Sequence, residues 1–415
     1  MLDRTVAPAF IKSNTFELPG FQESDVNGIP LFIVPEVHQD VLKIEFMFQS
    51  GKRHEPKGGM SHFTSNMLEK GTRRLNSSEL AEAFDHMGAH IEISAGYDDC
   101  AVSVYALRKN WKEVAELFAE MISTPSFDDE ELQLMKDIFL QNLNINKEKT
   151  SFLASQLIRK NIFGDHPYGT SLEEKDVVAL HSDALKAFHT SHFRPAAIFV
   201  TTHPSVTAEE IIKRFSLFVA APPDNMQLPD VVPGKKVEHI TKEGVQTSLR
   251  LGKRSLNRKD EFYPDLLLFN HILGGYFGSR LMKNIREEKG LTYGIYSSIN
   301  PFRHDSFFAI GADVNKDNRD VALEEIRKEM KRMRTEAVDS TELEIARNHF
   351  LGSLQSEVAN PFSVTDKIKN IHLNDLSKNY YPQLFKRINA LTAKDLLRVG
   401  EQYVHEDAMF IATVG

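Results

Sequence analysis

Short segments in which hydrophobic and polar residues alternate open the first half of the chain. They are VLKIEFMFQSG from Val41, AHIEISAGYD from Ala89 and CAVSVYALR from Cys100. Such alternation is the period-2 pattern of a strand with one buried face. NWKEVAELFAEMIS from Asn110 instead repeats its apolar residues with helical spacing, and AAIFVTT from Ala196 predicts a final apolar strand. The first half is therefore predicted to combine a sheet with long amphipathic helices.

The second half repeats this order of elements. Its alternating segments are VQTSLRLGKRS from Val245, YGIYSSINPF from Tyr293 and SFFAIGADV from Ser306. A helical stretch, DVALEEIRKEMKRM, follows from Asp320, and AMFIATV from Ala408 closes the half as an apolar strand. Strands gathered early with helices clustered later favour an α+β domain, with a mostly antiparallel sheet packed on one side by helices.

The two halves are also related by a fixed separation in the sequence. FDDEELQLMKDIFLQNL, from Phe127, and VDSTELEIARNHFLGSL, from Val338, each carry Glu-Leu followed by Phe-Leu. The same separation of 211 residues holds for Leu140 and Leu351, Leu180 and Leu391, Leu185 and Leu396, Ala197 and Ala408, and Phe199 and Phe410. A constant register over so many positions indicates an internal duplication, so we expect two homologous α+β domains.

A proline-rich segment without periodicity separates the two copies. It runs over residues 220–236 and is typical of a linker. The predicted organisation is an N-terminal domain over residues 1–219, the linker over 220–236 and a homologous C-terminal domain over 237–415.

Composition restricts the classes of function. The formal net charge is −8, from 58 acidic and 50 basic residues, and argues against nucleic-acid binding, which calls for a basic surface. No apolar run approaches about 18 residues, so no membrane span is expected. The N-terminus, MLDRTVAPAFIKSN, has no signal-peptide pattern, and Cys100 is the only cysteine. We expect a cytoplasmic protein; a trimmed signal peptide would place it in the periplasm instead.

The segment after the first strand, SGKRHEPKGGMSHFTSNMLEKGT, resembles the signature of the pitrilysin/insulinase family of zinc peptidases. This family includes bacterial two-domain forms and the subunits of mitochondrial processing peptidase. Its signature is Gly-x-Arg-x-Glu, a glycine turn and a helix with His-x-x-Glu-His before Met-Leu-x-x-Gly-Thr. The flanks agree at Gly51, Arg53, Glu55, Gly59, Met67, Leu68, Gly71 and Thr72. GDHPYGT from Gly164 and GSRLMKNIREEKGLTY from Gly278 extend the resemblance over essentially the whole chain, and it implies a processing-peptidase-like fold.

The residues that would bind zinc in this motif are mostly replaced. Histidines at i and i+4 share a helical face and can hold one zinc, and the intervening glutamate is the general base. Here His62 keeps the first position, but Ser65 replaces the base and Asn66 the second histidine. The resemblance implies a third ligand, a glutamate, at the position of Asn142, 76 residues beyond Asn66. Since zinc prefers imidazole, thiolate or carboxylate, we expect no metal in this chain and no peptide hydrolysis by it alone.

Two other interpretations of the metal-site region remain open. His62 can be a relic that is hydrogen-bonded within the former pocket. Alternatively, a metal site could have been rebuilt from His86, His90 or Glu69, although their spacings do not recreate the motif.

The second half keeps residues that the resemblance assigns to substrate. Arg286 and Tyr293 lie seven apart in IREEKGLTYGIYSS. In the family, an arginine and a tyrosine at this spacing hold the substrate backbone and help to stabilise the oxyanion. Both are hydrogen-bond donors suited to that role. The sequence therefore predicts a non-catalytic subunit of a heterodimeric zinc metallopeptidase. Its partner would be a homologous chain with an intact His-x-x-Glu-His motif that supplies the zinc, and its substrates would be peptides.

The sequence is also compatible with two other functions. A scaffold or peptide-binding protein with no part in catalysis would make no use of Arg286 and Tyr293. A catalytic homodimer with an unusual site would bind zinc as the isolated chain.

Overall fold

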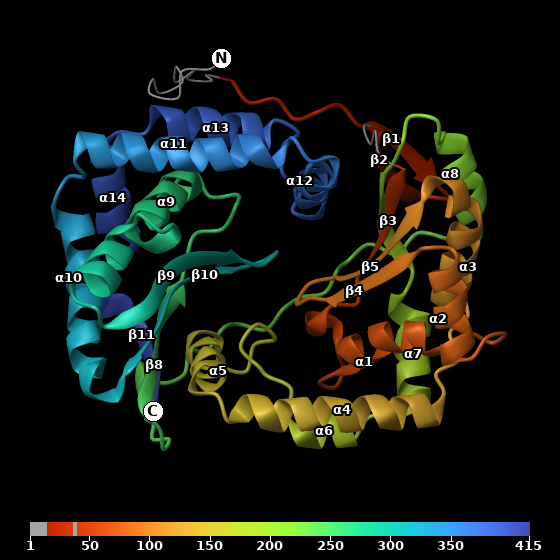
Figure 1. Ribbon diagram of the computed structural model, residues 1–415, viewed down its shortest axis with the longest axis horizontal. Helices are drawn as coiled ribbons and strands as arrows, with labels where there is room; N and C mark the ends of the chain where they lie inside the picture. Colours follow the sequence, from red (N-terminus) through yellow and green to blue (C-terminus); the bar gives the residue numbers. More distant parts are fainter. Residues whose placement is uncertain (1–14, 36–39) are drawn as a thin grey trace, which may run out of the picture.

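Two helix-covered sheets, one in each half of the chain, make up the molecule (Figure 1). The computed structural model describes residues 15–35 and 40–415. The N-terminal stretch in which no signal-peptide pattern was found lies outside these residues. The two-domain α+β architecture predicted from the sequence is confirmed.

The first sheet has six strands in the order β1-β2-β6-β3-β5-β4. All neighbouring pairs are antiparallel except β2 and β6, which are parallel. The strands are β1 (Gln22–Val26), β2 (Ile29–Val34), β3 (Val41–Phe48), β4 (His90–Ala95), β5 (Cys100–Leu107) and β6 (Pro195–Thr201). The helices are α1 (Met60–Asn66), α2 (Ser77–His86), α3 (Trp111–Ser123), α4 (Asp129–Lys147), α5 (Thr150–Phe163), α6 (Glu174–Val178), α7 (Ser182–His192) and α8 (Ala208–Phe215).

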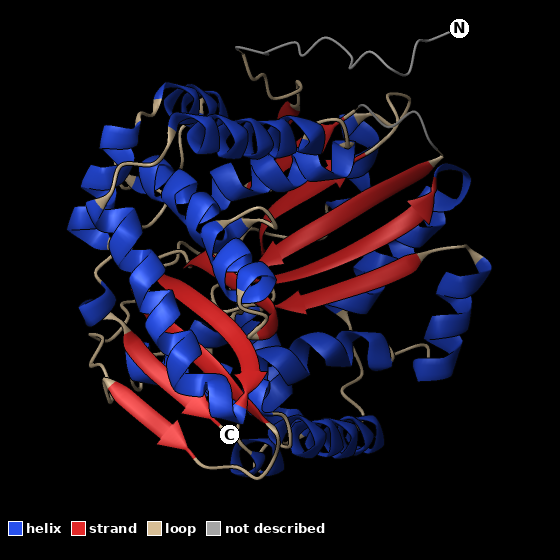
Figure 2. Ribbon diagram, turned by 60° about the vertical axis from the view of Figure 1, so that its left-hand side comes forward, coloured by secondary structure: helices blue, strands red, loops and turns tan. Residues whose placement is uncertain are grey.

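The second sheet has five strands in the order β7-β11-β8-β10-β9, again mostly antiparallel, with β7 and β11 parallel. Figure 2 shows the strands of both sheets in red against the blue helices. The strands are β7 (Val237–Ile240), β8 (Gln246–Arg254), β9 (Thr292–Pro301), β10 (Ser306–Asn315) and β11 (Phe410–Val414). The helices are α9 (Tyr263–Asn270), α10 (Arg319–Thr335), α11 (Ser340–Glu357), α12 (Pro361–Leu373), α13 (Tyr380–Ala390) and α14 (Ala393–Tyr403).

The duplication is visible in the bounds of the helices and in their caps. α4 and α11 begin 211 residues apart, as do α5 and α12, and α7 and α14. The carboxylate of Asp128 accepts hydrogen bonds from the backbone N–H groups of residues 130 and 131, at 2.9 and 3.1 Å. Asp339, 211 residues later, caps α11 in the same way. Equivalent capping residues thus start equivalent helices.

The two halves exchange a pair of equivalent helices. α5 of the first half packs on β8 and β11 of the second, whereas α12 of the second packs on β2 and β6 of the first (Figure 1). The Thr150 hydroxyl on α5 lies 2.9 Å from that of Ser248 on β8. Thr365 on α12 makes the matching contact, with a hydroxyl–hydroxyl distance of 2.6 Å to Thr201 on β6. This exchange makes the halves depend on each other for the burial of their sheets.

Each half has its own hydrophobic core, and the core of the second half includes a side chain from near the N-terminus. Phe46, on β3, is fully buried and meets the rings of Phe118 and Phe215 edge-on. Phe16 instead belongs to the core of the second half, where it stacks on Phe385 at 5.9 Å. Phe16 therefore lies against the second half, a few residues before the chain enters β1 in the first. Within residues 15–35 and 40–415, no helix combines the length and apolar character needed to cross a bilayer.

Candidate functional site

The helix that carries the degenerate motif is α1, and its start is fixed by a signature carboxylate. The Glu55 side chain accepts hydrogen bonds from the backbone N–H groups of Gly59, at 3.1 Å, and Ser61, at 2.8 Å. Burial raises the pKa of this carboxyl group, while the two hydrogen bonds oppose that rise. Gly59 has φ +89°, a conformation that side-chain-bearing residues rarely adopt. Glu55 and Gly59 therefore match the family signature because they shape the turn into α1.

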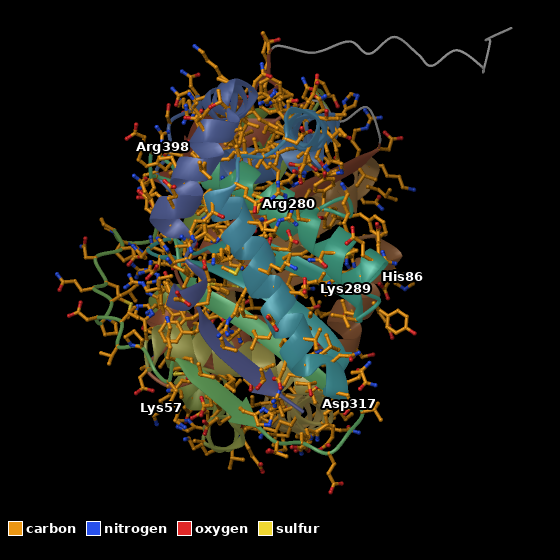
Figure 3. The ribbon with its side chains drawn as sticks, turned by 90° about the vertical axis from the view of Figure 1, so that its left-hand side faces the viewer. Lys57, His86, Arg280, Lys289, Asp317 and Arg398 are labelled. Atoms are coloured by element: carbon orange, nitrogen blue, oxygen red, sulfur yellow. The ribbon has the colours of Figure 1, made fainter. Side chains whose placement is uncertain are left out.

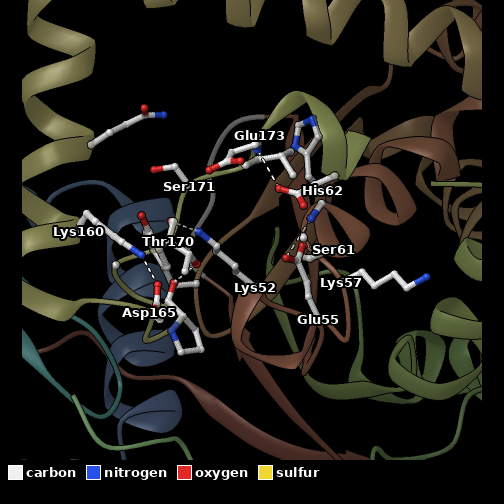
Figure 4. A pocket seen from close by; sticks show the side chains of 18 of the residues that line it. Lys52, Glu55, Lys57, Ser61, His62, Lys160, Asp165, Thr170, Ser171 and Glu173 are labelled. Carbon is white, nitrogen blue, oxygen red and sulfur yellow. Dashed lines mark hydrogen bonds and ion pairs between the residues drawn. The ribbon is translucent and has the colours of Figure 1, made fainter. Parts of the chain in front are cut away.

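We expect Glu55→Ala to lower the free energy of unfolding by about 1 kcal/mol, because the first turn of α1 loses both side-chain acceptors. Chemical denaturation measures this. Lys57→Ala is the matched control, since Lys57 is exposed and Figure 4 shows its side chain extending away from the motif. Equal stabilities of the two variants would contradict the capping role.

His62 lies against aromatic rings rather than against potential metal ligands. Its ring centroid is 5.3 Å from that of Phe63 and 5.3 Å from that of Phe139 on α4. Burial lowers the pKa of His62, so the imidazole is neutral near pH 7. The side-chain amide nitrogen of Asn66 lies 3.4 Å from Nδ1 of His62. This environment suits a half-buried, hydrogen-bonded histidine.

The two substituted positions on α1 are engaged with their own helix. The Ser65 hydroxyl is fully buried and donates to the carbonyl of Ser61 at 2.8 Å. The Asn66 amide donates to the carbonyl of His62 at 2.7 Å. Asn142, the position of the implied third ligand, lies on α4, and its side chain is exposed. One turn earlier on the same helix, Phe139 contacts His62.

A pocket of about 1000 Å³ lies beside α1 (Figure 4). Of the four motif positions, all within the described part of the chain, only His62 lines it. The Lys52 amine donates to the carbonyl of Thr170 and lies 5.4 Å from the centre of the Tyr97 ring. Burial lowers the pKa of Lys52 to about 8, with a smaller opposing contribution from Glu55.

These residues do not fit a catalytic zinc ion. Such a site needs three nitrogen, sulfur or carboxylate ligands that converge on one open position. The four motif positions offer a single imidazole, beside an amide and a phenyl ring. Over residues 15–35 and 40–415, no group of three or more His, Cys, Asp or Glu side chains could hold a metal ion, so a site rebuilt around Glu69, His86 and His90 finds no support.

Neither Phe139 nor Lys52 was identified as a site residue from the sequence. A phenylalanine in a helix normally indicates core packing, and only the fold shows that this ring covers His62. Lys52 occupies a variable position of Gly-x-Arg-x-Glu, and its burial follows from the approach of residues 165–170, far along the chain. The one available signal was that Phe139 lies three residues before Asn142, and so on the same helical face.

Arg286 and Tyr293 lie on neighbouring elements of the second half. Arg286 is on η5 (Met282–Glu288), a π-helix, and Tyr293 is on β9, the edge strand that packs against it. The Arg286 guanidinium lies over the ring of Phe277 at 4.7 Å. Tyr293 is 95% exposed and Phe277 64%. Such π-helices occur frequently at functional sites, and a second one, η4 (His271–Gly275), precedes Phe277.

Arg280, six residues before Arg286, is held in an ion pair within the chain. Arg280 forms a two-pronged ion pair with Glu342, at 2.9 and 2.7 Å, and so ties the loop between the π-helices to α11. Figure 3 shows Arg280 and Lys289 on the same side of the second half. Arg280 is therefore a structural residue, whereas the described contact of Arg286 is with an exposed ring.

Two protein-family models match successive parts of the chain. Residues 34–176 match the model described as insulinase (peptidase family M16), and residues 179–350 match the peptidase M16 inactive domain. The chain is 24% identical over 381 residues to the uncharacterised zinc protease YmxG of Bacillus subtilis, which covers 90% of this chain and 92% of that protein. An uncharacterised zinc protease of Rickettsia bellii is 26% identical over 340 residues, covering 79% and 81%.

Solved structures share the fold at low identity. A crystal structure described as a peptidase M16 inactive domain from Pseudomonas fluorescens superposes with a TM-score of 0.88 and 24% identity, over 96% of this chain and 98% of that one. A protease from Helicobacter pylori gives 0.86 and 17%, over 96% and 100%. The chain belongs to the M16 (insulinase) family of peptidases. Because Ser65 and Asn66 stand in the His-x-x-Glu-His motif, it is an inactive-type member.

Proposed function

We propose that this chain is the non-catalytic subunit of a heterodimeric zinc metallopeptidase. In this proposal, a homologous partner with an intact His-x-x-Glu-His motif supplies the zinc. This chain closes the substrate chamber and contributes Arg286 and Tyr293 to the peptide that is held at the partner's metal.

The proposal rests on one contrast between two parts of the chain. In the motif on α1, Ser65 stands in place of the general base and Asn66 in place of the second histidine. Both side chains donate hydrogen bonds to backbone carbonyl groups of their own helix. Arg286 and Tyr293, in contrast, are both present, and the phenol of Tyr293 is 95% exposed. A phenol and a guanidinium at a surface can donate hydrogen bonds to an external carbonyl or oxyanion.

The test compares hydrolysis of a quenched fluorescent peptide library by this chain, by a homologous chain with the intact motif, and by an equimolar mixture. Activity that appears only in the mixture is the expected result. Chelator-sensitive activity of this chain alone would refute the proposal and favour a homodimer with an unusual site. A mixture no more active than the homologous chain would favour a scaffold or peptide-binding role instead.

A further inference from the structure

The two halves meet at the tips of two equivalent hairpins. The turn between β4 and β5 carries Asp98 and Asp99, and the turn between β9 and β10 carries Arg303. The backbone N–H of Arg303 donates to the Asp98 carboxylate at 2.9 Å, and its guanidinium donates to Asp99 at 2.6 Å. Residues more than 200 positions apart are thus joined by charged hydrogen bonds.

The linker between the halves enters the same cluster through Asp224. Its carboxylate pairs with the Arg53 guanidinium and lies 3.8 Å from that of Arg303. His54 Nε2 is 3.6 Å from the same oxygen. Arg53, which is only 2% exposed, also lies 3.3 Å from Asp98. The linker is therefore pinned between one arginine from each half.

Aromatic rings close one side of the cluster. Phe302, next to Arg303, stacks on Tyr168 of the first half with ring centroids 4.1 Å apart. The Tyr168 hydroxyl donates to Asp98 at 2.6 Å, and Tyr97 meets Phe302 at 5.0 Å. This packing removes water from the carboxylates and so raises the cost of uncompensated charge.

The charges in the cluster do not balance. Two guanidinium groups, of Arg53 and Arg303, face three carboxylates, of Asp98, Asp99 and Asp224. The nearby histidines add no positive charge near pH 7: burial, followed by the charge of Arg53, lowers the pKa of His54 to about 3. Burial also lowers the pKa values of His166, His192 and His304 and raises that of Tyr168, which stays protonated. One proton would neutralise the cluster.

We propose that these residues form a clasp between the two halves that takes up one proton, on Asp99, as it closes. One oxygen of Asp99 accepts from Arg303, but the other, Oδ1, is buried and has no hydrogen-bond partner among the described residues. Burial raises the pKa of Asp99 to about 6, even though Arg303 and Arg53 oppose the rise; Asp98 adds to it. In an open clasp, where water solvates this side chain, its pKa returns towards 3.8.

The direction of the pH effect follows from these two states. Because the closed clasp binds the Asp99 proton more tightly than the open one, a fall in pH through about 6 favours closure. As the pH rises through that value, the proton is lost and the clasp weakens. With one proton exchanged, the closure equilibrium changes about tenfold between pH 7.5 and pH 5.0.

The experiment measures the separation of the halves directly. Spin labels on cysteines at Ser78 of α2 and Arg327 of α10, both exposed, report the distance distribution between the halves of the full chain. We expect a population of longer or broader distances that grows from pH 5.0 to pH 7.5. Asp99→Asn keeps the shape of the side chain without a charge, and should hold the closed distribution at both pH values.

Two further variants make the test specific. Asp224→Asn breaks the ion pair with Arg53 but leaves Asp99 buried, so it should keep the pH response, as should Asp230→Asn, a change at an exposed aspartate of the same linker. Circular dichroism confirms that each variant is folded. A wild-type distribution that does not change with pH, or an Asp99→Asn variant that keeps the wild-type response, would overturn the proposal.

Discussion

Arg286→Ala is expected to reduce peptide hydrolysis by the assembled pair about 10²–10³-fold, the usual effect of removing one donor to a tetrahedral oxyanion. The loss should fall on kcat rather than on KM, because the donor acts where negative charge develops. Steady-state kinetics of the mixed subunits, at saturating concentration of the variant chain, measure both quantities. Tyr293→Phe removes only a hydroxyl group from a side chain that is 95% exposed, and we expect a loss in the same direction.

The control for this prediction comes from the same π-helix. Lys283 is exposed on η5, one turn before Arg286, so Lys283→Ala changes the surface charge by the same amount. Arg286→Lys adds a test of geometry, since it keeps the charge but loses the planar fork of donors. If Arg286→Ala and Lys283→Ala leave the pair equally active, the trans contribution is wrong and the chain is a scaffold.

Much of the architecture could be predicted because the duplication repeats its signals. Alternating segments at Val41 and Val245 predicted strands in both halves, and the separation of 211 residues recurs in the starts of α4 and α11. The exchange of α5 and α12 between the halves could not be predicted. The periodicity of apolar residues can show where a helix lies, but it does not show which sheet covers its apolar face.

The site was predictable only in its chemistry. Comparison of Ser65 and Asn66 with the family motif was enough to show that the general base and the second histidine are replaced. The direction of the side chains depends on packing: Ser65 turns to its own helix, and Phe139 takes the place beside His62. The clasp could not be predicted from the sequence. Asp98, Arg303 and Asp224 are of residue types that are common at protein surfaces, and only the fold brings them together.

Arg53→Met is expected to lower the free energy of unfolding by about 3–5 kcal/mol, the cost of removing one partner from a buried ion pair. Arg53 is the signature arginine of Gly-x-Arg-x-Glu, and its loss would leave Asp98 and Asp224 without their cation from the first half. Thermal and urea unfolding measure the effect. Arg73→Met, at an exposed arginine of the same half, should change stability by less than about 0.5 kcal/mol.

The double variant Arg53→Met/Asp224→Asn separates the ion pair from the packing of the side chain. If the cost of Arg53→Met comes from carboxylates left buried, removing one of those charges should restore part of the stability. A double variant that loses the sum of both single effects would assign the cost to lost packing instead. Either result helps to explain why Arg53 and Glu55 match the family motif while positions 65 and 66 do not. Arg53 and Glu55 stabilise the fold, whereas zinc ligands serve only the reaction. If this chain acts as the non-catalytic subunit proposed above, positions 65 and 66 are free to vary, but the chain still needs the arginine that anchors its two halves.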